Sequence, residues 1–201
     1  MTDLPLHLEP ATSALLVMDF QASIVDMVAD NAALVERTAR LVAAARARGL
    51  RTIYVVVGFR PGYPEVSARN ASFSQITQTG RFAPSDPGAQ VHPAIAPHAD
   101  DVVVTKHRVS AFAGTDLDIV LRANRIETLV LAGIATSGVV LSTVRHAADA
   151  DYRLVVVEDC CADRDPEVHA TLVHKVFARQ ATVTSSAAVI TALGATAPAA
   201  R

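Results

Sequence analysis

LVLAGIATSGVVLSTVRHAA, residues 129–148, is the stretch from which the fold of this chain can be inferred. Its apolar first residues, Leu129 to Gly133, are typical of a buried strand, and Ile134 to Gly138 are typical of a tight turn. A helix is predicted from about Val139. In an α/β chain, a strand that breaks sharply into a helix N-terminus is a common place for a catalytic nucleophile. Because valine has no reactive group, the stretch is either a catalytic turn without its nucleophile or an ordinary connection.

Strands and helices alternate along most of the chain. Apolar runs, which are typical of buried strands, predict strands at residues 14–20, 51–58, 101–106, 128–134, 153–159 and 181–186. Helices are expected at residues 31–50, 116–124, 138–151, 166–180 and 187–193. This β-α-β alternation predicts the α/β class, with a six-stranded, mainly parallel sheet that helices cover on both faces.

The length of 201 residues fits one domain, so we expect a single domain over 1–201. Its ends, 1–12 and 194–201, are expected to be frayed tails. Residues 58–100 break the pattern, because they are rich in proline and glycine and show little periodicity. A loop of this length is usually functional, as a lid or an interface arm. The other interpretation is a poorly ordered excursion.

The composition argues against several classes of partner. A formal net charge of −2 without a Lys/Arg cluster argues against nucleic acid. No apolar run approaches the length of about 20 residues that a membrane span needs, and the N-terminus does not look like a secretory signal. The two cysteines are adjacent, which predicts a reduced, cytoplasmic protein. A hydrophobic share of 51% indicates a well-buried sheet or a surface partly covered by a second subunit.

Polar residues follow the expected strands at their carboxyl ends, where ligands bind to an open parallel sheet. Asp19 and Gln21 follow the first strand, and Lys106 ends the third. If these strands approach each other, Lys106 is the natural ammonium partner of Asp19. A semi-buried pair of this kind can hold and transfer a proton in general acid–base catalysis. A structural salt bridge explains the same spacing equally well.

The turn before the helix supplies a further group to this edge of the sheet. Unsatisfied backbone N–H groups and the positive end of a helix dipole bind anions. Thr136 and Ser137 are good N-cap residues, and Gly138 allows a ligand to approach the backbone closely. Taken alone, an ordinary βα turn with a capping hydroxyl is the more common explanation.

Three segments, taken together and in this order, resemble the isochorismatase-like (cysteine hydrolase) superfamily. They are ALLVMDFQ (14–21), VVVTKHRVSAFAGTDLDIVLRANRIETLVLAGIAT (102–136) and VVLSTVRHAADADYRLVVVEDCCADRDPEVH (139–169). The resemblance covers residues 13–185 and is weakest over 58–100. It implies a Rossmann-like three-layer α/β/α hydrolase that forms a homodimer or homotetramer and acts on a small-molecule substrate.

The resemblance also assigns an active site. Asp19 and Lys106 match the aspartate and the lysine of the family. The family's turn reads G-[IV]-x-T-x-x-C-V, and residues 133–140 read GIATSGVV here, so Val139 stands at the place of the nucleophilic cysteine. The family often has a non-proline cis peptide in this turn, which would fall at Ile134–Ala135.

Neither a metal nor another cofactor is expected. Nicotinamidase-type members hold a metal through an Asp-x-His motif after the second strand, where this chain has GFRP (58–61). The histidines also lack carboxylates at metal-like spacing; they are His7, His92, His98, His107, His146, His169 and His174. Cys160 and Cys161 follow the fifth strand without a base nearby in the sequence, so we expect them to be buried and without a catalytic role.

Without the thiol, the acyl-enzyme route to amide hydrolysis is closed. Isochorismatases themselves lack this cysteine, and by the resemblance Asp19 would protonate an enol ether of the isochorismate type while water attacks the resulting cation. Lys106 would hold Asp19 and a substrate carboxylate, and Gln21 would orient substrate or water. Authentic isochorismatases tend to carry a histidine where this chain has Ser137. Isochorismate is therefore named as the substrate by analogy alone, and another enol ether or another hydrolysable compound fits as well. The alternative is an inactive member that binds a small molecule or is a structural subunit of an oligomer.

Further residues are expected to line the substrate pocket. Those expected from the turn are Ala135, Thr136, Ser137, Gly138 and Val139. Those expected from other segments are Phe59, Arg60, Tyr63 and Phe112. The turn would contribute shape and N–H groups, and the aromatic residues would form walls. Arg60, and likewise Arg81 of the same irregular region, could bind a substrate carboxylate. Core packing and a solvated arginine are the competing explanations.

Overall fold

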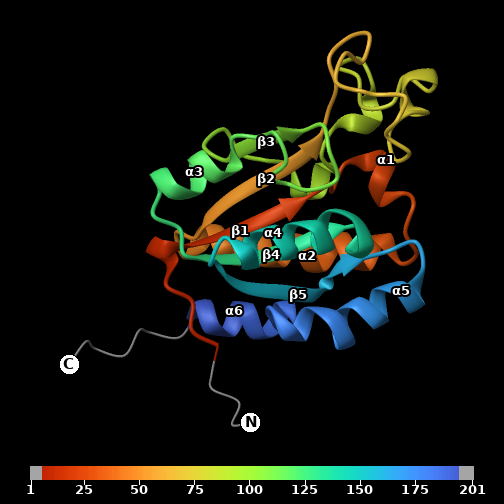
Figure 1. The fold of residues 1–201 in the computed structure, drawn as a ribbon. Coiled ribbons are helices and arrows are strands. Elements are labelled where there is room, and N and C mark those ends of the chain that lie inside the picture. The colour runs from red at the N-terminus through yellow and green to blue at the C-terminus, as the bar shows by residue number, and fades with distance from the viewer. Residues whose placement is uncertain (1–5, 195–201) are drawn as a thin grey trace.

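The structure is a computed structural model that describes residues 6–194 (Figure 1). Its centre is one six-stranded sheet with the order β3-β2-β1-β4-β5-β6, in which every neighbouring pair is parallel. The strands are β1 (Ser13–Met18), β2 (Arg51–Val57), β3 (Val102–Lys106), β4 (Thr128–Ile134), β5 (Arg153–Ala162) and β6 (Thr182–Thr184). The predicted α/β class with a six-stranded sheet is confirmed, and the sheet is parallel throughout.

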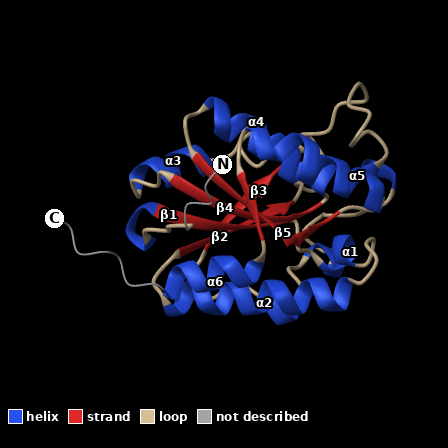
Figure 2. Ribbon diagram, turned by 90° about the horizontal axis from the view of Figure 1, so that it is seen from below, coloured by secondary structure: helices blue, strands red, loops and turns tan. Residues whose placement is uncertain are grey.

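Helices cover both faces of the sheet (Figure 2). On one face lie α1 (Ala22–Val25), α2 (Asn31–Ala47) and α6 (Ser186–Gly194), and on the other lie α3 (Leu117–Ala123), α4 (Leu141–Asp149) and α5 (Pro166–Thr171). The expected three-layer α/β/α architecture is therefore confirmed. No helix within residues 6–194 is long and apolar enough to cross a membrane.

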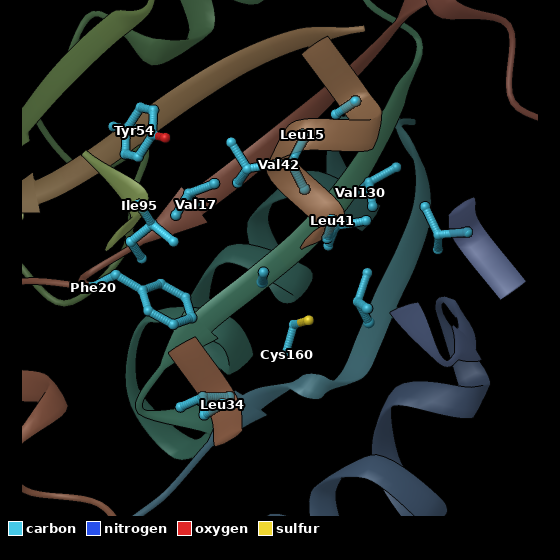
Figure 3. Packing of buried hydrophobic residues seen from close by; sticks show 14 of the residues in the cluster. Leu15, Val17, Phe20, Leu34, Leu41, Val42, Tyr54, Ile95, Val130 and Cys160 are labelled. Atoms are coloured by element: carbon cyan, nitrogen blue, oxygen red, sulfur yellow. The ribbon is translucent and has the colours of Figure 1, made fainter. Parts of the chain in front are cut away.

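The buried strands divide their side chains between two cores. In β1, Leu15 and Val17 belong to the core under α2, whereas Leu16 and Met18 belong to the core under α4. Figure 3 shows the α2 side, where Leu41 and Val42 of the helix lie over the strands. Because every residue of β1 is buried, the continuous apolar run arises from a strand that packs on both faces.

Element ends depart from the expected ranges where the backbone is irregular. The helix predicted over 138–151 begins with a π-helical turn at Thr136–Val140 before α4. The helix predicted over 166–180 is divided into α5, a π-helical turn at Leu172–Val176 and a 3₁₀ turn at Phe177–Arg179. β5 runs beyond its predicted end because of a register shift, since Leu131 of β4 pairs with Val156 but Gly133 pairs with Cys161.

The long segment between β2 and β3, residues 58–101, extends beyond the carboxyl end of the sheet and is called the excursion below (Figure 1). It contains 3₁₀ turns at Ile76–Gln78, Pro87–Ala89 and Pro93–Ile95. Phe59 and Phe82 form a small core of their own with Val57 of β2, and the Phe59 N–H donates to the Phe82 carbonyl at 2.9 Å.

The N-terminal segment contacts the core earlier than the expected tail over 1–12. Leu6 packs against the core under α2, and Leu8 is buried within it. A 3₁₀ turn at Pro10–Thr12 then leads into β1. The rest of that tail, 1–5, and the C-terminal tail after Gly194 lie outside the described residues.

Candidate active site

The central strand β1 ends where the sheet changes winding direction. β2 and β3 lie on one side of β1, and β4, β5 and β6 lie on the other. In open α/β sheets, the loops diverge at this point and leave a crevice at the carboxyl ends of the strands. Asp19 directly follows β1, has a left-handed backbone with φ 58°, and donates its N–H to the Val55 carbonyl at 2.8 Å. The backbone therefore fixes this carboxylate at the crevice.

Lys106, the last residue of β3, reaches across β2 to Asp19. Its Nζ lies 2.9 Å from Asp19 Oδ2 and donates to the Arg108 carbonyl at 3.0 Å. Both side chains are buried. Asp19 Oδ1 is buried as well and has no hydrogen-bond partner among residues 6–194. The structure thus brings together the two residues that the sequence suggested as a pair, and it leaves one carboxylate oxygen unused.

The proton affinity of Asp19 reflects two opposing effects. Burial raises the pKa of the carboxyl, whereas the charge and the hydrogen bond of Lys106 lower it, and the result is a pKa of about 6. A carboxyl with this pKa exchanges a proton near neutral pH, which suits a general acid or base.

A cavity of about 670 Å³ opens beside this pair. Asp19 and Lys106 line it together with Ala135, Gly138 and Val139 of the turn after β4. Its other wall comes from the excursion between β2 and β3, which contributes Ser72, Phe73, Gln75, Ile76, Thr79, Arg81 and Phe82. Residues far apart in the sequence thus enclose one space next to the charged pair.

The turn after β4 packs closely on the sheet. A Cβ atom at Gly133 would lie only 3.0 Å from Val140 Cγ2 and 3.2 Å from Met18 Cβ, so glycine is needed for the close approach. The Ile134–Ala135 peptide is cis. Val139 is buried and lines the cavity.

The polar groups of this turn are largely engaged by the segment after β5. The Ser137 N–H donates to Asp163 Oδ2 at 2.7 Å, and Thr136 Oγ1 lies 2.8 Å from His169 Nδ1. Burial lowers the pKa of His169, so its ring favours the neutral form that can accept from a hydroxyl. The Gly138 N–H donates to the Ala135 carbonyl at 3.1 Å. The expected N-caps Thr136 and Ser137 do not cap the turn with their side chains; a carboxylate from another segment binds it instead.

Gln21 uses its amide within the protein. Its Nε2 donates to the carbonyls of Val57 and Ala89 at 2.8 and 2.7 Å, and its Oε1 accepts the Val57 N–H at 2.7 Å. The side chain is fully buried and does not line the cavity. Through these hydrogen bonds, the Gln21 side chain connects the end of β1 to β2 and to the excursion.

The remaining predicted residues, Phe59, Arg60, Tyr63 and Phe112, do not line the cavity. Phe59 and Arg60 line a second cavity, of about 670 Å³, on the far side of Val57 and Phe82, and Arg60 pairs with Glu65. The Tyr63 hydroxyl donates to the Arg81 carbonyl at 3.0 Å. Phe112 stacks on His146 with ring centres 4.3 Å apart, under α4.

Two arginines lie in the cavity wall, and of these the sequence offered Arg81 as a ligand for a carboxylate but not Arg164. Arg81 lies in the excursion and Arg164 in the loop after β5. Arg164 gave no such signal in the sequence, because the predicted strand ended at residue 159, whereas β5 runs to Ala162 and so brings Arg164 to the carboxyl edge of the sheet. Of the two arginines that the sequence offered from the long irregular region, Arg81 lines this cavity and Arg60 lines the second one.

Both cysteines lie away from this space. Cys160 and Cys161 are free and buried in opposite cores, and neither lines the cavity. Burial raises the pKa of the Cys160 thiol to about 11 and raises that of Cys161 further, so neither is poised to act as a thiolate. Within residues 6–194, the His, Cys, Asp and Glu side chains form no group of three or more that could hold a metal ion.

Comparison with known proteins shows similarity along nearly the whole chain. Residues 13–188 match the model of the isochorismatase domain. The isochorismatase family protein YecD of Escherichia coli O157:H7 is 32% identical over 194 residues, which cover 94% of this chain and 100% of YecD. The ureidoacrylate amidohydrolase RutB of Methylobacterium radiotolerans is 30% identical over 185 residues, covering 81% of this chain and 72% of RutB. A cysteine hydrolase from Pseudomonas syringae pv. phaseolicola 1448A superposes with a TM-score of 0.86 at 26% identity, covering 96% and 99% of the two chains.

Proposed function

The chain belongs to the isochorismatase family, and from this premise we propose that it is a hydrolase in which Asp19 and Lys106 supply acid–base chemistry and water is the nucleophile. The proposed substrate class is a small enol ether of the isochorismate type. Similar proteins include a ureidoacrylate amidohydrolase, so family membership alone does not select an enol ether over an amide. The choice between these substrates depends on the chemistry that this cavity offers.

The observation that carries the proposal is the state of the Asp19 carboxyl. One oxygen is held by Lys106 at 2.9 Å, and the other is buried without a partner among residues 6–194. Leaving a buried polar atom unpaired costs free energy, so the free oxygen is better explained by a role toward a ligand than by stability. With a pKa of about 6, this oxygen can carry the proton that the reaction needs.

The proposed reaction proceeds in three steps. Protonated Asp19 donates its proton to the terminal carbon of the enol ether, and the carbon that bears the ether oxygen becomes an oxocarbenium ion. Water then forms a bond to that carbon and returns a proton to Asp19. The resulting hemiketal collapses, the ether C–O bond breaks, and the products are a keto acid and an alcohol. Lys106 keeps Asp19 in place and stabilises its carboxylate between the two proton transfers.

Amide hydrolysis through an acyl-enzyme is disfavoured for this chain. That route needs a nucleophile next to a base, and the cavity offers the hydrocarbon side chain of Val139 beside Asp19 and Lys106. Ser72 and Thr79 also line the cavity, but within residues 6–194 neither forms a hydrogen bond with Asp19 or Lys106, and the Thr79 hydroxyl donates to the Ile76 carbonyl at 2.9 Å. We therefore expect amides to be poor substrates despite the similarity to RutB.

The test is pyruvate release from isochorismate and from a panel of simpler enolpyruvyl ethers, with ureidoacrylate and nicotinamide as amide controls. The proposal expects turnover of at least one enol ether and little of the amides. Turnover of amides alone would contradict it. If no member of either panel reacts, the hydrolase proposal fails, and the alternative of an inactive small-molecule-binding or structural subunit takes its place.

A further inference from the structure

The cavity beside Asp19 carries an excess of positive charge. Four ionisable side chains line it: Asp19, Lys106, Arg81 and Arg164. Asp19 and Lys106 offset each other at 2.9 Å. Among residues 6–194, neither arginine forms an ion pair with a carboxylate. Two guanidinium groups in the wall of the cavity are therefore without a carboxylate ion-pair partner in the described part of the chain.

The carboxylates closest in sequence to these arginines are committed to backbone groups. Asp86 accepts the N–H groups of Phe82 and Gly88 at 2.7 and 2.8 Å. Asp163 accepts the Ser137 N–H at 2.7 Å, and Asp165 accepts the Glu167 N–H at 2.9 Å. These three carboxylates thus accept hydrogen bonds from turns or a helix end, and none of them forms an ion pair with either arginine.

The contacts of the arginines themselves are with neutral groups. The Arg81 guanidinium lies 5.0 Å from the centre of the Phe82 ring, and its Nη2 lies 3.4 Å from both oxygens of Ser23. The guanidinium of Arg164 contacts the thioether of Met27. Such contacts position the two groups but leave their charges unpaired, and two like charges lining one cavity attract an anion into it.

We propose that Arg81 and Arg164 bind an acidic group of the ligand, so that the cavity selects small organic acids over neutral amides. The inference rests on the proposed function in taking this cavity as the substrate site. Guanidinium groups suit the purpose, because their N–H groups match both oxygens of a carboxylate in one plane. One arginine comes from the excursion and the other from the loop after β5, so a bound acid connects the two walls of the cavity.

Binding of two matched probes tests the inference without turnover. Succinate and succinamide have similar size, but only succinate is charged. Calorimetric titration should show succinate binding at least about 10-fold tighter than succinamide, because hydrogen bonds between charged groups are stronger than those between neutral ones. Arg81→Gln and Arg164→Gln should each weaken succinate binding by about 10-fold to 100-fold. Arg81→Lys, which keeps the charge but loses the planar pair of N–H groups that can bind both oxygens of a carboxylate, should retain part of the affinity.

Arg69→Gln is the matched control, since Arg69 is an exposed arginine of the same excursion that does not line the cavity. Its succinate binding should equal that of the wild type. The inference is overturned if succinate does not bind, if succinamide binds equally well, or if both Gln variants bind succinate normally. Enol-ether turnover without succinate selectivity overturns this inference alone, whereas succinate selectivity without turnover overturns only the proposed function.

Discussion

At the scale of the residue, Asp19 differs from an ordinary ion-paired carboxylate. Lys106 engages only one of its oxygens, and burial raises its pKa to about 6 in spite of that partner. A carboxylate selected for stability alone would be expected to have a lowered pKa and satisfied oxygens. These features make Asp19 the first residue to test.

Asp19→Asn keeps the shape of the side chain but cannot donate a proton as a carboxylic acid. We expect kcat on an enol ether to fall by about 100-fold to 10,000-fold, the usual contribution of a general acid. Pyruvate release measures the effect, and a ligand titration should show that the variant still binds succinate. An activity within about threefold of the wild type would remove Asp19 from the proposed mechanism.

The pH dependence of catalysis gives the direction of proton transfer. If Asp19 acts as the acid, kcat/KM is constant below a pH of about 6 and falls as the pH rises above it, because the protonated form disappears. The measurement is a pH profile of enol-ether hydrolysis. A rate that rises through the same pH and then levels off would identify Asp19 as a base and contradict the proposed order of steps.

Lys106→Met removes the ammonium that lowers the pKa of Asp19. We expect the midpoint of the pH profile to move up by about 1 unit or more. The free energy of unfolding should also fall, because an unpaired carboxylate is costly when buried. The loss should be larger at pH 8, where Asp19 is ionised, than at pH 5, where it is protonated. Urea denaturation at both pH values checks this, and an equal loss at both would mean that Lys106 acts through packing alone.

Sequence reasoning was well suited to residues whose place follows from a strand end. Asp19 and Lys106 both end apolar runs that had to be buried parallel strands, so their meeting at one edge could be expected. Gln21 also follows β1, but whether its amide faces ligand or backbone depends on Val57 and Ala89, which belong to distant parts of the chain. Local pattern does not contain that information.

At the scale of the element, the Gln21 side chain connects three segments. Gln21→Ala would leave the Val57 N–H and two carbonyls without this partner. We expect the free energy of unfolding to fall by about 2–4 kcal/mol, because three hydrogen bonds are lost and the backbone groups that made them stay buried without a partner. Gln78→Ala, in an exposed 3₁₀ turn, should change stability by less than about 0.5 kcal/mol. Equal stability of the two variants in urea would contradict the structural role assigned to Gln21.

The turn after β4 shows why the details of an element escape the sequence. Its strand and helix were predicted from apolar periodicity, and both are present. Its π-helical start and the binding of Ser137 by Asp163 depend on the segment after β5. Thr136 and Ser137 have the chemistry of N-caps, but tertiary contacts engage the hydroxyl of one and the N–H of the other. Where another loop packs on a turn, tertiary hydrogen bonds of this kind override the capping propensity of its residues.

At the scale of the whole molecule, the excursion between β2 and β3 was the part least accessible to prediction. It has no periodicity to interpret, and it is held by long-range contacts such as the Phe59–Phe82 hydrogen bond and the Gln21–Val91 bridge. Nevertheless it builds one wall of the cavity. The sheet and its helix layers followed from the alternation of elements, whereas the shape of the cavity did not.

The assembly of subunits stays a prediction. We expect a homodimer or homotetramer, as the family resemblance implies. Among residues 6–194, three large apolar side chains are well exposed: Val103, Ile119 and Val168, at 47%, 69% and 37%. They lie on the separate elements β3, α3 and α5, and single exposed apolar residues are ordinary on a protein surface, so they do not identify a subunit interface. Sedimentation equilibrium at micromolar concentration checks the expectation, and a stable monomer over that range would contradict it.

The central place of β1 has a consequence for how the chain is made. β1 pairs with β2, which is synthesised soon after it, but also with β4, which begins only at Thr128. A chain emerging from the ribosome can therefore assemble β1, β2 and β3, including Asp19 and Lys106, while one edge of the fully buried strand β1 still lacks a neighbour. Unpaired edges of this kind recruit strands from other chains. We expect the yield of folded protein in a cell to depend on the pace of translation and on chaperones during that interval, rather than on the stability of the finished molecule.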